Sequence, residues 1–146
     1  MRGRLAALAA TLVLTAGVFV QQPSWAQDAK GAVTVEEKQV FFVARRDTVF
    51  ALIDLYSQRA QIEALSPAEQ KAALKATAEQ QGRLLLAKPG MEGVSKVRIE
   101  FGYIKNMDEY ARQDFSSMVR HGHVLLQKDS DSMRFLEEKL DFKAGA

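Results

Sequence analysis

Cysteine is absent from the 146 residues of this chain. Thiol catalysis, disulfide exchange and thiolate metal sites are therefore excluded. Small secreted domains that cannot bury enough apolar surface usually depend on disulfides. A chain without cysteine has to hold its fold through its hydrophobic core alone.

Sequence motifs of the common catalytic classes are also missing. The chain contains no phosphate-binding loop, no dinucleotide-binding fingerprint and no Gly-x-Ser-x-Gly turn, and it has only two histidines. These absences favour a protein that binds something over one that performs a reaction, and no cofactor is expected.

The first 26 residues have the three parts of a cleavable secretory signal peptide. Arg2 and Arg4 give a cationic start, residues 5–20 are uncharged and mostly apolar, and residues 24–26 (Ser-Trp-Ala) have small side chains at both outer positions. The alternative is a retained membrane anchor, but a spanning helix needs about 20 apolar residues, which is longer than this run. We therefore predict cleavage after Ala26, a periplasmic or secreted protein, and no stable membrane span after cleavage.

Cleavage changes the charge of the protein. The whole chain has 20 Lys and Arg against 18 Asp and Glu, and Arg2 and Arg4 leave with the signal peptide. The mature chain of 120 residues (146 minus 26) then carries 18 charges of each sign. A neutral chain lacks the excess of cations that nucleic acid attracts, so no nucleic-acid partner is expected.

The length of the mature chain suits one domain. We expect a flexible leader over residues 27–33, a single globular domain over residues 34–143 and a disordered tail over residues 144–146.

Hydrophobic spacing predicts a helix-dominated α+β domain that begins with a helical hairpin over about residues 35–86. The second helix of this hairpin starts at a capping box formed by Ser66 and Glu69 around Pro67. The first helix is expected to be long, over residues 35–64, because no Gly or Pro interrupts it. Residues 40–44 (Val-Phe-Phe-Val-Ala) leave a buried strand open as an alternative.

Downstream of residue 90, strict alternation of apolar and polar residues predicts a short strand over residues 97–104. A second short strand is expected over residues 123–128. Apolar residues at helical spacing predict two further helices, near residues 107–119 and 133–140. The alternative to this α+β arrangement is an all-α bundle.

Aromatic residues are numerous for so small a domain, and core packing accounts for most of them. The first predicted helix is nevertheless apolar on more than one face, so part of it is available to a partner. We expect a binding surface for a protein partner, a small apolar ligand or a second copy of the chain in a homodimer. Its candidate residues are Phe41, Phe50, Tyr56, Phe101 and Tyr103. The leading functional hypothesis is a periplasmic, non-catalytic binding or accessory protein.

A metal site is a second hypothesis. His121 and His123 are two residues apart, so their rings share one side of an extended chain, and imidazole binds copper and zinc. Met118 would add a thioether ligand for copper. Metal sites need three or four ligands, and the competing interpretation is a polar helix end.

A small hydrolase with carboxylates around residues 108–114 is the third hypothesis. Asp108, Glu109 and Asp114 lie close together in the sequence, but Asp108 and Arg112 also have the spacing of an ordinary surface ion pair. Acid or base catalysis would require a cleft and a shifted carboxyl pKa.

Overall fold

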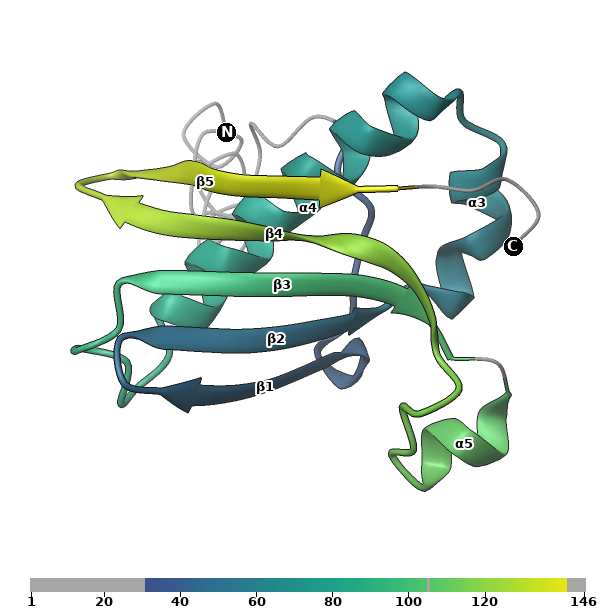
Figure 1. Cartoon of the computed structure of the whole chain (residues 1–146), viewed down its shortest axis with the longest axis horizontal. Helices are drawn as coiled ribbons and strands as arrows, with labels where there is room; N and C mark the ends of the chain where they lie inside the picture. Colours follow the sequence, from purple (N-terminus) through teal and green to yellow (C-terminus); the bar gives the residue numbers. More distant parts are fainter. Residues whose placement is uncertain (1–30, 105, 142–146) are drawn as a thin grey trace, which may run out of the picture.

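The structure is a computed structural model that describes residues 31–104 and 106–141 (Figure 1). The predicted signal peptide, the predicted tail and most of the predicted leader lie outside these residues. Val33, the last residue of the predicted leader, is described and is buried. Its amide donates a hydrogen bond to the hydroxyl of Thr77 at 2.8 Å, so the folded part begins no later than Val33.

Five strands form one mixed sheet in the order β1-β2-β3-β4-β5. β2 and β3 run parallel, and the other neighbouring pairs are antiparallel. The strands are β1 (Val40–Arg45), β2 (Thr48–Asp54), β3 (Lys96–Tyr103), β4 (Val119–Asp129) and β5 (Ser132–Leu140). A parallel pair requires a crossover connection, which here contains the longest helix of the described residues.

That helix is α4 (Pro67–Leu86), which covers one face of the sheet. In Figure 1 it lies behind the strands, and no helix of the described residues crosses in front of them. The shorter helices lie at the ends of strands: η2 (Glu37–Gln39), η3 (Tyr56–Gln58), α3 (Arg59–Glu63) and α5 (Met107–Ala111). We call the face without α4 the open face.

One hydrophobic core joins α4 to the covered face of the sheet. Alternation along β3 directs its apolar side chains toward the helix, and α4 contributes apolar residues from the side that faces the sheet. The buried members include Leu74, Ala78, Leu85, Val97, Ile99, Phe101, Val124 and Leu126. Among the described residues, no helix has the length and hydrophobicity needed to cross a membrane.

The predicted helix-dominated fold is wrong, and so is its all-α alternative, because the chain is sheet-rich. Residues 35–64 form β1, β2 and short helical turns instead of one long helix. A two-residue turn, Arg46-Asp47, joins two runs of β-branched and aromatic residues, which favour strands. Arg46 adopts a left-handed φ of 57°, a conformation that glycine usually marks in a sequence.

The two helices predicted downstream are also largely wrong. α5 covers only Met107–Ala111, and residues 133–140 belong to β5. A second two-residue turn, Ser130-Asp131, folds β5 back on β4. The helix over residues 67–86 and the strand near residues 97–104 are confirmed. The capping box of α4 forms as predicted: Ser66 Oγ accepts from the Glu69 amide, and Glu69 Oε2 accepts from the Ser66 amide at 2.9 Å.

Candidate binding site on the open face of the sheet

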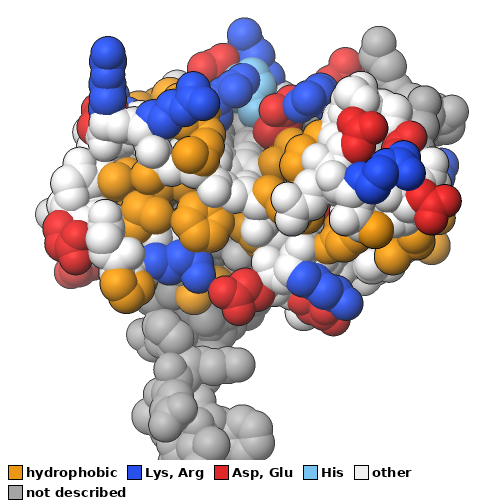
Figure 2. Space-filling model, turned by 90° about the horizontal axis from the view of Figure 1, so that it is seen from below, with side chains coloured by type: hydrophobic (Ala, Val, Ile, Leu, Met, Phe, Trp, Pro, Cys, Tyr) orange, Lys and Arg blue, Asp and Glu red, His pale blue; other side chains and the backbone are white. Residues whose placement is uncertain are grey.

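The open face is hollowed beside β1, and we call this depression of about 370 Å³ the β1 hollow. Strands β1 to β4 and the loop after α5 contribute to it. Its lining residues are Phe41, Phe42, Val43, Phe50, Ala51, Leu52, Arg98, Glu100, Phe115 and Arg120. Figure 2 looks at the β1 edge of the molecule, where hydrophobic side chains gather and Lys and Arg side chains stand above them.

Strand register explains the apolar wall of the β1 hollow. Phe41 pairs with Leu52 and Val43 pairs with Phe50 across the β1–β2 ladder. Directly paired residues of neighbouring strands share one face of a sheet. All four side chains therefore lie together on the open face, where α4 does not cover them.

The neighbouring strands supply charge. Arg98 lies beside Phe50 in the β2–β3 register, and Glu100, two pairs further along, lies beside Leu52 on the same face. Arg120 of β4 contacts Glu100, with Nη1 2.6 Å from Oε1, so these two charges neutralise each other. The guanidinium of Arg98 forms no ion pair or hydrogen bond with another described residue. The β1 hollow therefore combines an aromatic wall with one uncompensated cation.

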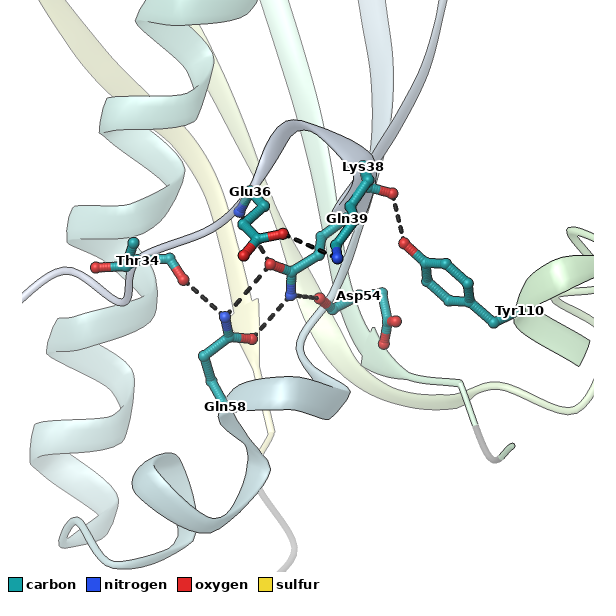
Figure 3. Close-up of polar contacts among 7 residues, drawn as sticks. All are labelled: Thr34, Glu36, Lys38, Gln39, Asp54, Gln58 and Tyr110. Atoms are coloured by element: carbon teal, nitrogen blue, oxygen red, sulfur yellow. Dashed lines mark hydrogen bonds and ion pairs between the residues drawn. The ribbon is translucent and has the colours of Figure 1, made fainter. Parts of the chain in front are cut away.

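The segment around α5 closes one end of the β1 hollow. The rings of Phe115 and Phe41 meet edge to face with centroids 4.7 Å apart, and Tyr110 contacts the same Phe41 ring at 5.9 Å. The hydroxyl of Tyr110 donates to the carbonyl of Lys38 at 2.6 Å (Figure 3). Burial raises the pKa of this phenol, which keeps it protonated as a donor.

Two glutamines hold the chain that enters β1. Figure 3 shows the side chains of Gln39 and Gln58 facing each other. Gln39 Nε2 donates to the Asp54 carbonyl and to Gln58 Oε1, both at 2.9 Å. Gln58 Nε2 donates to the Thr34 carbonyl at 2.7 Å. These bonds attach the segment before β1 to the end of β2 and so fix the position of the edge strand.

Two of the five aromatic residues predicted for binding line the β1 hollow, and three do not. Phe41 and Phe50 both line the β1 hollow. Tyr56 is exposed in η3 but does not line it, whereas Phe101 and Tyr103 are buried in the hydrophobic core. Sequence reasoning missed the other eight lining residues: Phe42, Val43, Ala51, Leu52, Arg98, Glu100, Phe115 and Arg120. The alternation of residues 98 and 100 with buried neighbours is the signal that would have found the two charges on β3.

The two histidines do not converge. The register of β4 against β3 shifts at Gly102, which leaves His121 as an extra residue beside Gly122, whose φ is 116°. His121 is buried against Tyr103 on the covered face. His123 pairs with Glu100 on the open face, and its Nε2 lies 3.2 Å from Glu137 Oε1.

The three predicted metal ligands, Met118, His121 and His123, therefore do not form a metal site. Met118 is buried, with its side chain against Gly102. Over residues 31–104 and 106–141, no group of three or more His, Cys, Asp and Glu side chains is arranged to hold a metal ion.

The carboxylates near α5 are occupied by local hydrogen bonds. The hydroxyl and amide of Ser116 donate to Asp114 Oδ1 at 2.6 and 3.2 Å, and the hydroxyl of Ser117 donates to Glu109. The Ser116 hydroxyl bond is the main cause that lowers the pKa of Asp114. A general acid needs a raised carboxyl pKa, which is the opposite direction.

Comparison of this chain with protein-family models, with curated proteins and with solved structures gave no match. The assignment of a function therefore depends on the geometry of the open face.

Proposed function

We propose that this protein is a non-catalytic binding protein that takes a small ligand with an apolar body and one anionic group in the β1 hollow. On the strength of the signal peptide predicted for residues 1–26, it works in the periplasm or outside the cell. The observation that carries the proposal is the uncompensated guanidinium of Arg98 next to the wall formed by Phe41, Phe50 and Leu52.

The size and lining of the β1 hollow support a small ligand. Small-molecule sites usually enclose about 300–1,000 Å³, are mostly apolar and use a few polar groups for orientation. Burial of apolar surface stabilises a complex by about 25 cal/mol per Å². The exposed ring of Phe50 and the half-buried ring of Phe41 offer such surface without any change in the core.

The charges support an anionic group on that ligand. A guanidinium donates two parallel hydrogen bonds to a carboxylate, sulfonate or phosphate, and it is always charged. Glu100 is the one carboxylate among the described residues that line the β1 hollow, and Arg120 already engages it. One unmatched positive charge, that of Arg98, then remains for the ligand.

The test uses the mature chain, residues 27–146, and the fluorescent probe 8-anilinonaphthalene-1-sulfonate, which has an aromatic body and a single anion. Dodecanoate should displace the probe, and dodecanol, which has the same chain without the charge, should do so at least ~10-fold more weakly. Arg98→Gln should remove this preference. Phe50→Ala should weaken both ligands, because it shortens the apolar wall.

Arg134→Gln is the matched control, because Arg134 lies on β5 and does not line the β1 hollow. It should leave probe binding and the preference for dodecanoate unchanged. Equal binding by Arg98→Gln and the parent chain would show that the site or its ligand class is wrong.

A further inference from the structure

The two edges of the sheet differ in the features that prevent strand pairing. β5 carries Arg134, Glu137, Glu138 and Lys139, and a register shift opposite Leu125 and Leu126 bends its ladder. Charged side chains and bulges are the usual means by which proteins stop an edge strand from pairing. β1 has neither over residues 40–44, which are all apolar, and its ladder with β2 is regular.

The side chains of β1 remain exposed although they are apolar. Val43 is 50% exposed and Phe42 is 42% exposed, and these two residues direct their side chains to opposite faces of the sheet. A ligand in the β1 hollow would cover only the open face. An added strand would cover both faces of this edge together.

Backbone groups along β1 are also directed outward. The turn Arg46-Asp47 bonds Arg45 to Thr48, and hydrogen-bonded pairs alternate with non-bonded pairs along an antiparallel ladder. The amide and carbonyl of Ala44, and those of Phe42, therefore point away from β2. Among the described residues no strand lies beyond β1 (Figure 1), so these groups are available to another strand.

We propose that a second copy of this chain pairs antiparallel along β1, joining the two sheets into one and closing the outer side of each β1 hollow. A two-fold axis perpendicular to the sheet keeps both open faces on the same side. Val43 and Phe41 of the partner subunit then stand beside the β1 hollow of the first subunit. The pairing goes beyond the proposed ligand and does not depend on it.

Charge favours a second copy as the occupant. The hairpin end of β1, residues 45–47, is Arg-Arg-Asp with a net charge of +1, and residues 36–38, which lead into β1, are Glu-Glu-Lys with a net charge of −1. Antiparallel pairing places each end of one strand beside the opposite end of its copy. Arg45 and Arg46 form no ion pair among the described residues. At the other end, Glu37 lies 3.4 Å from Lys88 and Glu36 lies 3.1 Å from Lys38, but the side chains of Glu37 and Glu36 remain 90% and 64% exposed. These charges are therefore accessible to the partner subunit.

The oligomeric state of the mature chain tests this pairing by sedimentation equilibrium. The parent chain should be a dimer at about 100 μM, since dimer formation follows protein concentration. Ala44→Pro removes an amide that points away from β2, so it should weaken dimerisation by at least ~10-fold while β1 stays paired to β2. Ala44→Ser keeps the amide and should remain dimeric.

A second pair of variants tests the same edge through its side chains. Val43→Lys should give monomers, because a lysine on an edge strand opposes pairing. Leu136→Lys is its control, since Leu136 is 42% exposed on the opposite edge strand, and it should stay dimeric. Ala44→Pro is uninformative if its circular dichroism spectrum differs from that of the parent chain, because it is then misfolded. In that case the comparison of Val43→Lys with Leu136→Lys tests the dimer by itself.

A monomeric parent chain at that concentration would overturn the proposal, and so would a dimer that survives Val43→Lys. Probe binding by the monomeric Ala44→Pro variant separates the two proposals. If this variant is monomeric and still prefers dodecanoate to dodecanol, the ligand site does not depend on the dimer. If the parent chain is a dimer but does not prefer dodecanoate, the pairing along β1 is supported and the proposed ligand class is wrong.

Discussion

The rings of Tyr103 and His121 meet edge to face with centroids 4.3 Å apart and an interplanar angle of 68°. Both residues are buried on the covered face of the sheet, near the guanidinium of Arg59, which lies 5.6 Å from the Tyr103 ring centroid. Burial disfavours the charged form of each side chain, so it lowers the pKa of His121 and raises the pKa of Tyr103 to about 12. The burial of these two side chains makes the stability of the fold depend on pH.

The first prediction concerns acid. Because the folded protein holds His121 with a lowered pKa, the unfolded chain binds its proton more readily than the folded chain does. The stabilisation is present above the ordinary histidine pKa of about 6.5 and is lost as pH falls through the folded value. Urea unfolding between pH 7.5 and 5 should show this loss, and His121→Phe should reduce the slope with pH. An identical slope in both proteins would contradict the assignment.

The second prediction compares two tyrosines. The hydroxyl of Tyr103 is buried and has no hydrogen-bond partner among the described residues, whereas that of Tyr110 donates to Lys38. Tyr103→Phe should therefore leave the free energy of unfolding unchanged or raise it by up to about 1–3 kcal/mol. Tyr110→Phe should lower it by about 0.5–1.5 kcal/mol. Thermal and urea unfolding measure both, and the reverse order of stabilities would show that the hydroxyl contacts are misassigned.

The third prediction concerns the residue that separates the histidines. Gly122 has a φ of 116°, and an added Cβ would overlap the carbonyl oxygen of Lys139 on β5. Gly122→Ala should lower the free energy of unfolding by more than ~2 kcal/mol, since both the backbone and β5 must move. Gly93→Ala is the control, because no atom lies within 4 Å of its added Cβ, and it should change stability by less than about 0.5 kcal/mol. Similar effects from the two substitutions would argue against this backbone geometry.

The fourth prediction tests the β1–β2 turn. Arg46 has a φ of 57°, which costs about 1–2 kcal/mol for a residue with a Cβ and nothing comparable for glycine. Arg46→Gly should raise the free energy of unfolding by about 1 kcal/mol after the greater freedom of glycine in the unfolded chain is subtracted. Arg45→Gly, in the adjoining strand, should lower it by about 0.5–1 kcal/mol instead. Destabilisation by Arg46→Gly would mean that the arginine side chain contributes more than its backbone strain costs.

Local signals allowed α4 to be predicted from sequence, but not the hairpin before it. Ser66 and Glu69 cap α4 through contacts within one turn, so its start did not depend on the rest of the fold. The turn Arg46-Asp47 has no Gly, and Arg46 adopts a left-handed conformation where β1 folds back to pair with β2. Without a recognisable turn, the absence of Gly and Pro favours one long helix over residues 35–64, with a strand over residues 40–44 as the alternative.

The prediction of a helix over residues 133–140, which form β5, was wrong for a related reason. The register shift in the β4–β5 ladder leaves Leu136 as an extra residue, which breaks the alternation that identifies a strand. Met133, Leu136 and Leu140 then have the spacing of a helical face, although each lies in β5. The candidate site depends on these strands, because aromatic character alone indicates Phe41 and Phe50, whereas the strand register places Arg98 beside Phe50.

Local sequence was enough to predict the absence of thiol chemistry, the helix over residues 67–86 and the strand near residues 97–104. Each of these follows from composition or from contacts between residues close in the chain. The tertiary structure alone decided that residues 40–44 form an unprotected edge strand, that His121 and His123 point to opposite faces, and that Arg98 meets an aromatic wall. Those outcomes depend on pairing between strands far apart in the sequence, which a pattern within one segment does not specify.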